Sequence, residues 1–175
     1  HAEDLFAKGI TITDASRLDV RGSVECGKDC SIDVNVILEG NIVLGDNVSI
    51  GPNCIIKNAN IGSNTKIEAF SHIDGAKIAD NCVIGPYARL REGSQIESSA
   101  KVGNFVETKN STLGKGSKAN HFTYLGDTII GEGTNVGAET LTGTNMGKDK
   151  HKTSIGNNSY IGCILYTTDV AHKRK

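Results

Sequence analysis

The dominant pattern in this 175-residue chain is an aliphatic or small apolar residue at every sixth position. The spacing is strict from Val20 to Ile56, and it resumes after five-residue steps at Ile61 and Ile78. The positions are Val20, Cys26, Ile32, Leu38, Leu44, Ile50, Ile56, Ile61, Ile67, Ile73, Ile78, Ile84, Leu90, Ile96, Val102, Leu113, Ala119, Leu125, Ile130, Val136, Ile155 and Ile161. A period of six matches neither the 3.6-residue helix nor simple strand alternation. It predicts short strands separated by tight turns.

Three such strands make one triangular coil of about 18 residues, in which every apolar position points inward and stacks on its equivalent one coil away. Copies such as "LGDNVS", "IGPNCI" and "IGPYAR" place Gly, Asn or other polar residues at the turns. Gly and Asn tolerate the positive φ that tight turns need. We therefore expect an all-β parallel β-helix shaped as a triangular prism over residues 11–175. Residues 1–10 read as the end of a helical linker, because "HAEDLFAKG" stops at Gly9.

The composition suits a narrow interior of thin layers, since aromatic residues are 5% of the chain and Trp is absent. The five cysteines, an odd number, lack the paired short spacing of a zinc site. Four of them fall on or beside the apolar lattice, which favours small buried side chains in a reducing compartment. These four are Cys26, Cys30, Cys54 and Cys82; the fifth, Cys163, lies outside the lattice. Three of the five histidines, His72, His121 and His151, share no spacing that would join them on one metal, so no metal is expected.

Charge and hydropathy exclude two classes of partner. A net charge of −1 provides no field that would attract nucleic acid or an anionic membrane. No apolar run approaches the roughly 20 residues of a membrane span, and no signal peptide is evident. The expectation is a cytoplasmic protein without nucleic-acid or membrane partners.

The lattice has one large break, between Val136 and Ile155. The stretch "GTNMGKDKHKTS" has no interior residue and carries several cations. It predicts an inserted loop at about 142–154. Insertions in solenoids leave one face, often the binding face, but a solvated basic loop fits the stretch equally well.

Two polar features could support chemistry. Arg91 and Lys109 are 18 positions apart, so they should stack as a cationic pair on one face, where a phosphate would relieve their repulsion. Two solvated surface cations remain the alternative. His121 is a candidate general base, because imidazole accepts a proton near neutral pH, although a lone histidine is more often structural.

The segments "RLDVRG", "IGPYARLREG", "VGNFVETKNSTLGKGSKANHFTYLGD" and "IGEGTNVGA" resemble the C-terminal domain of the bacterial bifunctional UDP-N-acetylglucosamine pyrophosphorylase/glucosamine-1-phosphate N-acetyltransferase. The resemblance runs from about Gly9 to Ala138 and returns in "KHKTSIGNNSYIG". It implies a left-handed β-helix and a homotrimer that transfers acetyl from acetyl-CoA to the amine of glucosamine 1-phosphate. The magnesium-dependent uridylyltransferase domain of that family would lie before residue 1.

The same resemblance implies a role for individual residues. His121 matches the catalytic base of the family. The matches to substrate-binding residues are Arg91, Lys109, Tyr124, Asn135 and Lys150. The matches on the acetyl-CoA side are Ala138, whose backbone N–H would stabilise the oxyanion or cofactor, together with Asn145 and Cys163.

The sequence departs from the family after Ala138. A "GTITCNYDG"-like segment of the family is replaced by "ETLTGTNMG", and the chain closes on "ILYTTDVAHKRK" where the family continues with further coils. Those coils, which complete the acetyl-CoA site, are missing or altered. Two alternatives therefore remain beside the acetyltransferase: a trimeric scaffold that binds sugar phosphate without catalysis, and a hexapeptide transferase for another amine.

Overall fold

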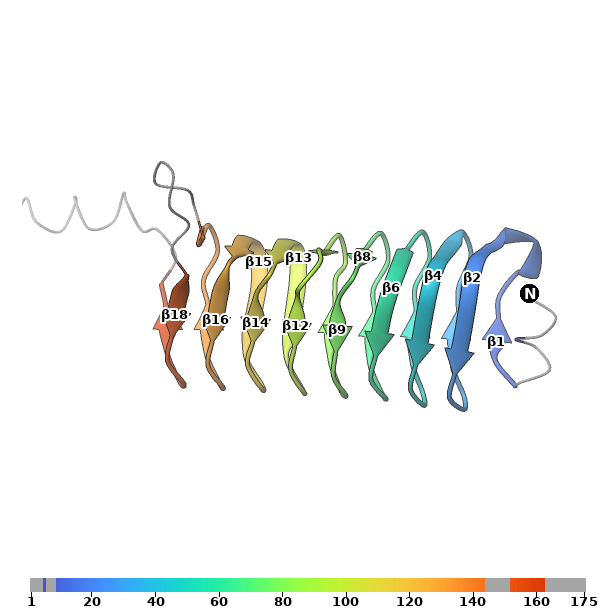
Figure 1. Cartoon of the computed structure of the whole chain (residues 1–175), viewed down its shortest axis with the longest axis horizontal. Helices are drawn as coiled ribbons and strands as arrows, with labels where there is room; N and C mark the ends of the chain where they lie inside the picture. Colours follow the sequence, from blue (N-terminus) through green and yellow to red (C-terminus); the bar gives the residue numbers. More distant parts are fainter. Residues whose placement is uncertain (1–4, 6–8, 144–151, 163–175) are drawn as a thin grey trace, which may run out of the picture.

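The computed structural model describes Leu5 and residues 9–143 and 152–162. Short strands stack along one axis, with β1 and β18 near opposite ends of the prism (Figure 1). Every strand pair is parallel. The molecule is a parallel β-helix, as the repeat predicts, and it is left-handed, as the resemblance implies. No helix within the described residues has the length and apolar character to cross a bilayer.

The elements are mostly strands of two residues, interrupted by a few strands that continue around a corner. In chain order they are β1 (Thr11–Ile12), the 3-10 helix η1 (Ala15–Arg17), β2 (Leu18–Cys26), β3 (Ser31–Ile32), β4 (Val36–Leu44), β5 (Ser49–Ile50), β6 (Ile55–Ile61), β7 (Lys66–Ile67), β8 (His72–Asp74), β9 (Lys77–Ile78), β10 (Val83–Ile84), β11 (Arg89–Leu90), β12 (Gln95–Ile96), β13 (Lys101–Lys109), β14 (Thr112–Leu113), β15 (Lys118–Gly126), β16 (Thr128–Ile130), β17 (Asn135–Val136), β18 (Thr153–Ile155) and β19 (Tyr160–Ile161).

Residues with positive φ recur in three columns, which mark the three corners of the prism. The first corner contains Asp29, Asn47, Asn64, Asn81, Ser99, Gly116, Gly133 and Asn158. The second corner contains Asn35, Asn53, Phe70, Tyr87, Phe105, Phe122 and Glu139. The third corner contains Gly40, Asn58, Gly75, Gly93, Asn110 and Asp127. Asn and Gly predominate because both adopt this backbone conformation at little cost.

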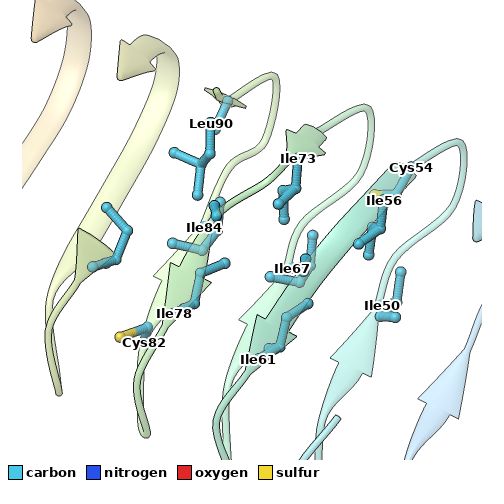
Figure 2. Packing of buried hydrophobic residues seen from close by; sticks show 14 of the residues in the cluster. Ile50, Cys54, Ile56, Ile61, Ile67, Ile73, Ile78, Cys82, Ile84 and Leu90 are labelled. Carbon is cyan, nitrogen blue, oxygen red and sulfur yellow. The ribbon is translucent and has the colours of Figure 1, made fainter. Parts of the chain in front are cut away.

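The predicted lattice lines the interior. Figure 2 shows three columns of side chains that stack from coil to coil, for example Ile50 on Ile67 and Ile84. Lattice positions from Ile32 to Val136 are buried. Val20, Cys26, Ile155 and Ile161, which belong to the end coils, are half-buried. Each layer stabilises the prism by burying apolar surface, which contributes about 25 cal/mol per Å².

Thr108 occupies an interior position that the aliphatic lattice leaves empty between Val102 and Leu113. It lies in β13 beside Leu90 and Leu125, and it is 1% exposed. Its hydroxyl lies 2.7 Å from that of Ser94, so each buried hydroxyl has a partner. A threonine replaces an aliphatic residue here because its neighbour in the core is also polar.

Cys30, Cys54 and Cys82 are fully buried free thiols, as the sequence predicts. Burial is the first cause that raises the pKa of each thiol above its ordinary value of 9.0. Cys26 is half-buried, and Cys163 lies outside the described residues.

The break in the repeat is visible in the strand register. Ile130 pairs with Ile155, 25 positions later, whereas Leu113 pairs with Ile130 after 17. The extra chain lies between Gly143 and Lys152, and residues 144–151 are outside the described part. Of the expected linker helix, Leu5 is buried and accepts a hydrogen bond from the Ile10 N–H; residues 1–4 and 6–8 are likewise not described.

Candidate functional site

The described candidate residues lie on both sides of the second corner. We call the side between the first and second corners the first face, and the side between the second and third corners the second face. His121 comes one residue before the corner residue Phe122, and Tyr124 comes two residues after it. His121 therefore ends the first face, while Tyr124 begins the second. A ligand that touches both must wrap around this corner.

Arg91 and Lys109 stack on the second face, as their spacing predicts. The Arg91 N–H donates to the Thr108 carbonyl at 2.9 Å, which sets Arg91 beside Lys109 of the next coil. Both residues line one hollow of about 310 Å³. Its lining residues are His72, Asp74, Arg89, Leu90, Arg91, Glu92 and Lys109. The hollow is rich in side chains that can hold a phosphate group.

Carboxylates accompany these cations, which the sequence analysis did not anticipate. The Arg91 Nη1 lies 2.9 Å from the Glu107 Oε1, with both side chains about one-third exposed. Asp74 and Glu92 also border the hollow. Glu107 is a site residue that the sequence analysis missed. The signal was present, since Glu107 precedes Lys109 by two residues and strand alternation puts both on one side.

Tyr124 borders a second hollow of about 440 Å³, whose lining is largely apolar. The residues around it are Phe105, Glu107, Phe122, Thr123, Tyr124, Glu139 and Leu141. Because Glu107 contacts Arg91 and also lines this second hollow, it joins the cationic and the apolar parts of the face. The arrangement places side chains that can bind an anionic group beside an apolar hollow, which suits a sugar phosphate.

The Tyr124 ring lies directly over Gly126. A Cβ on Gly126 would come within 2.7 Å of the Tyr124 ring and hydroxyl. Because Gly126 has no side chain, the Tyr124 ring can lie against the second face at this position. Position 126 is a supporting position for the predicted substrate contact.

His121 stands on β15 opposite Asn104 of β13. Its Nδ1 is 3.0 Å from the Asn104 Oδ1, and the pair is exposed. The strand register places these two residues side by side. His121 is not among the residues that line the two hollows; it lies across the second corner from them.

The second corner carries an exposed column of aromatic side chains. The rings of Phe70 and Tyr87 stack with centroids 4.9 Å apart, and those of Tyr87 and Phe105 with centroids 5.4 Å apart. Phe122 continues the column and is 63% exposed. Large side chains at positive φ in solvent are unfavourable both sterically and for hydration. Such a column is typical of a surface that contacts another molecule.

The other expected site residues are placed in part. Asn135 is half-exposed on the first face, where it pairs with Lys118 and Tyr160 of adjacent coils. Ala138 ends the same face, one residue before the corner residue Glu139. Asn145, Lys150 and Cys163 lie outside the described residues. In the part of the chain that the structure covers, no group of three or more His, Cys, Asp or Glu could hold a metal ion.

Comparisons with known proteins agree with the resemblance in sequence. Residues 20–96 match the family described as the GMPPB C-terminal domain. The bifunctional protein GlmU of Burkholderia vietnamiensis is 53% identical over 161 residues, and so is that of Acinetobacter baumannii strain AYE. Each match covers 92% of this chain and 36% of the relative, so the chain spans about a third of the length of these proteins.

Solved structures give weaker likenesses. The UDP-N-acetylglucosamine acyltransferase of Francisella novicida is 18% identical, with a TM-score of 0.37, over 70% of this chain and 64% of that chain. A TM-score this low says nothing about shared activity.

Proposed function

This chain is homologous over most of its length to part of the bifunctional protein GlmU, and from that premise we propose that it is an N-acetyltransferase. The proposed reaction moves the acetyl group of acetyl-CoA to the amine of glucosamine 1-phosphate. It would supply the precursor of UDP-N-acetylglucosamine. A uridylyltransferase activity of a longer protein is part of the same proposal.

The observation that carries the proposal is the cationic hollow on the second face. Arg91 and Lys109 stack there with Arg89 and His72 nearby. A dianionic phosphate can accept hydrogen bonds from both stacked cations, and the guanidinium offers a fixed fork of donors. The sugar ring would lie in the apolar hollow around Tyr124, whose lining residue Glu107 contacts Arg91.

His121 is proposed as the general base. The substrate amine attacks the thioester carbonyl carbon, its proton passes to the imidazole, and the C–S bond breaks to release the CoA thiolate, which takes a proton in turn. The backbone N–H of Ala138 would stabilise the oxyanion that forms at the carbonyl oxygen. Acetyl-CoA is thus a co-substrate, and the chemistry needs no metal.

The remaining assignments belong to the same proposal. Asn135 and Lys150 would contact the sugar phosphate, and Asn145 and Cys163 would border acetyl-CoA. The chain would act as a homotrimer, because the exposed aromatic second corner needs a cover and threefold closure supplies one. Acetyl-CoA and the buried free thiols both suit the cytoplasm.

Calorimetry and kinetics test the proposal together. We expect the protein to bind both glucosamine 1-phosphate and acetyl-CoA, and His121→Ala to lower kcat by about two to four orders of magnitude. Binding of glucosamine 1-phosphate should persist in this variant, because the phosphate hollow does not include His121. Binding of sugar phosphate but not acetyl-CoA would instead identify a non-catalytic scaffold.

A further inference from the structure

The amide of Asn104 faces the ring nitrogen Nδ1 of His121. The 3.0 Å separation joins this nitrogen to the Asn104 Oδ1. An amide oxygen accepts hydrogen bonds and cannot donate them. The contact therefore requires a proton on Nδ1, which leaves the lone pair of the neutral imidazole on Nε2.

We propose that Asn104 is the positioning residue that fixes this tautomer and aims Nε2 at the substrate amine. The proposal rests on the proposed function of His121 as a base. A histidine accepts a proton only through the nitrogen that lacks one, so the partner of the opposite nitrogen decides which atom can act. Asn104 does not touch the reacting atoms and acts through the imidazole.

The backbone holds this pair closely. Asn104 and His121 are in direct register on β13 and β15, so their side chains leave adjacent parallel strands at the same level. The residues just before this pair are Gly103 and Asn120, and a Cβ on Gly103 would meet the Asn120 carbonyl oxygen at 1.9 Å. Gly103 thus permits a backbone approach that no other residue allows. The rigid spacing limits the freedom of both side chains.

The uncharged amide of Asn104 suits the proposed role of His121 as a general base. A carboxylate opposite Nδ1 would stabilise the imidazolium and keep Nε2 protonated up to a higher pH, where it could not act as a base. Charged groups do lie on the surrounding elements, but among the described residues none is recorded in a hydrogen bond or ion pair with the imidazole. They are Lys101, Glu107 and Lys109 on β13, Lys118 on β15, and Glu139 after β17. The amide orients the ring without adding charge.

Two substitutions separate positioning from a structural role. Asn104→Ala should lower kcat by about 10- to 100-fold, the range found when the outer partner of a metal-bound histidine is lost. KM for glucosamine 1-phosphate should stay unchanged. Asn104→Asp keeps the acceptor, so it should retain more activity than Asn104→Ala at high pH. Its acid limb in the pH dependence of kcat should move up by about one pH unit.

Asn41→Ala is the matched control. Asn41 is an exposed asparagine whose Oδ1 also accepts a hydrogen bond from the preceding coil, from the Ser23 hydroxyl at 2.8 Å. This variant should leave kcat and the pH profile unchanged. Equal loss of activity in Asn41→Ala, or an unmoved acid limb in Asn104→Asp, would overturn the assignment.

The tautomer of His121 can be determined by a measurement that does not depend on enzyme activity. Nitrogen-15 chemical shifts of the His121 ring should show the proton on Nδ1 in the unaltered protein and a mixture of tautomers in Asn104→Ala. A proton on Nε2 in the unaltered protein, or an unchanged tautomer in the variant, contradicts the inference. If the shifts agree but no acetyl transfer occurs, the proposed function fails while the positioning by Asn104 stands.

Discussion

The Arg91 guanidinium and the Glu107 carboxylate form an ion pair at 2.9 Å across two coils of the helix. One of the two stacked cations therefore already has an anionic neighbour, while Lys109 has none recorded among the described residues. The pair is partly exposed, so its own contribution to stability is small. Under the proposed function, the carboxylate would orient the Arg91 guanidinium, and Lys109 would be the cation without a competing carboxylate that contacts the phosphate.

Replacement of Lys109 tests this division of roles. Lys109→Met should weaken binding of glucosamine 1-phosphate about tenfold, equivalent to about 1.4 kcal/mol, because a charge-assisted hydrogen bond is lost. Calorimetry at two salt concentrations should also show a smaller salt dependence. Lys101→Met is the control, since Lys101 is an exposed lysine on the same strand but on the first face. Equal weakening in both variants would argue against a local phosphate site.

Neutralisation of Glu107 should act in the opposite direction on a simple anion. In Glu107→Gln the Arg91 guanidinium no longer has a competing carboxylate, so inorganic phosphate should bind a few-fold more tightly. Titration calorimetry with inorganic phosphate measures this directly. Weaker phosphate binding in Glu107→Gln would show that the ordered position of Arg91 matters more than its free charge.

A side chain at position 126 should displace the Tyr124 ring. Gly126→Ala introduces a Cβ within 2.7 Å of that ring, and the flexible side chain can move without unfolding the backbone. We expect kcat/KM for glucosamine 1-phosphate to fall about tenfold with little change in melting temperature, because a small misplacement of a substrate contact is costly. Gly156→Ala is the control, since the nearest atom to its Cβ is 4.0 Å away. Full activity of Gly126→Ala would remove Tyr124 from the site.

The buried hydroxyl pair in the core predicts a non-additive response. Thr108→Val leaves the Ser94 hydroxyl without the partner that lies at 2.7 Å, which should cost about 1–3 kcal/mol of unfolding free energy. Adding Ser94→Ala removes the orphaned group, so the double variant should recover much of that loss. Denaturant unfolding of the single and double variants measures the coupling. Additive losses would mean that the two hydroxyls do not depend on one another.

The buried thiols predict a loss of stability at alkaline pH. Burial raises the pKa of Cys30, Cys54 and Cys82 above 9.0 in the folded state. Above that pH the unfolded chain loses thiol protons that the folded chain retains, so the unfolding free energy falls as pH rises. Melting temperatures between pH 8 and 10 should therefore drop less steeply in a triple Cys→Ala variant than in the unaltered protein. Parallel slopes would show that these thiols do not contribute.

The sequence alone predicted which residues fill the interior of the prism. Ile67, Ile84 and Leu90 satisfy the six-residue period and are fully buried. The prediction is reliable because each inward position makes the same contacts one coil away. The period did not predict Thr108, because it identifies only apolar inward positions. A polar residue is accommodated in the core only where a hydrogen-bond partner lies beside it, here the Ser94 hydroxyl.

The sequence predicted the residue types of the candidate site, but only part of their arrangement in space. The spacing of Arg91 and Lys109 predicted their shared hollow, because one coil is about 18 residues. The position of the second corner at Phe122 determines that His121 and Tyr124 occupy different faces. That corner follows from backbone dihedral angles, and an aromatic residue gives no signal for positive φ.

By itself the sequence determined the coil, its inward side chains and the residue types at the site, since a repeating pattern fixes repeating contacts. Only the tertiary structure decided that Glu107 forms an ion pair with Arg91, that Asn104 faces Nδ1 of His121 and that aromatic rings stack along one corner. These relationships depend on which outward side chains adjacent coils bring within a few ångströms. The residue type at an outward position is less constrained than at an inward one, because solvent accepts many side chains where the core accepts few.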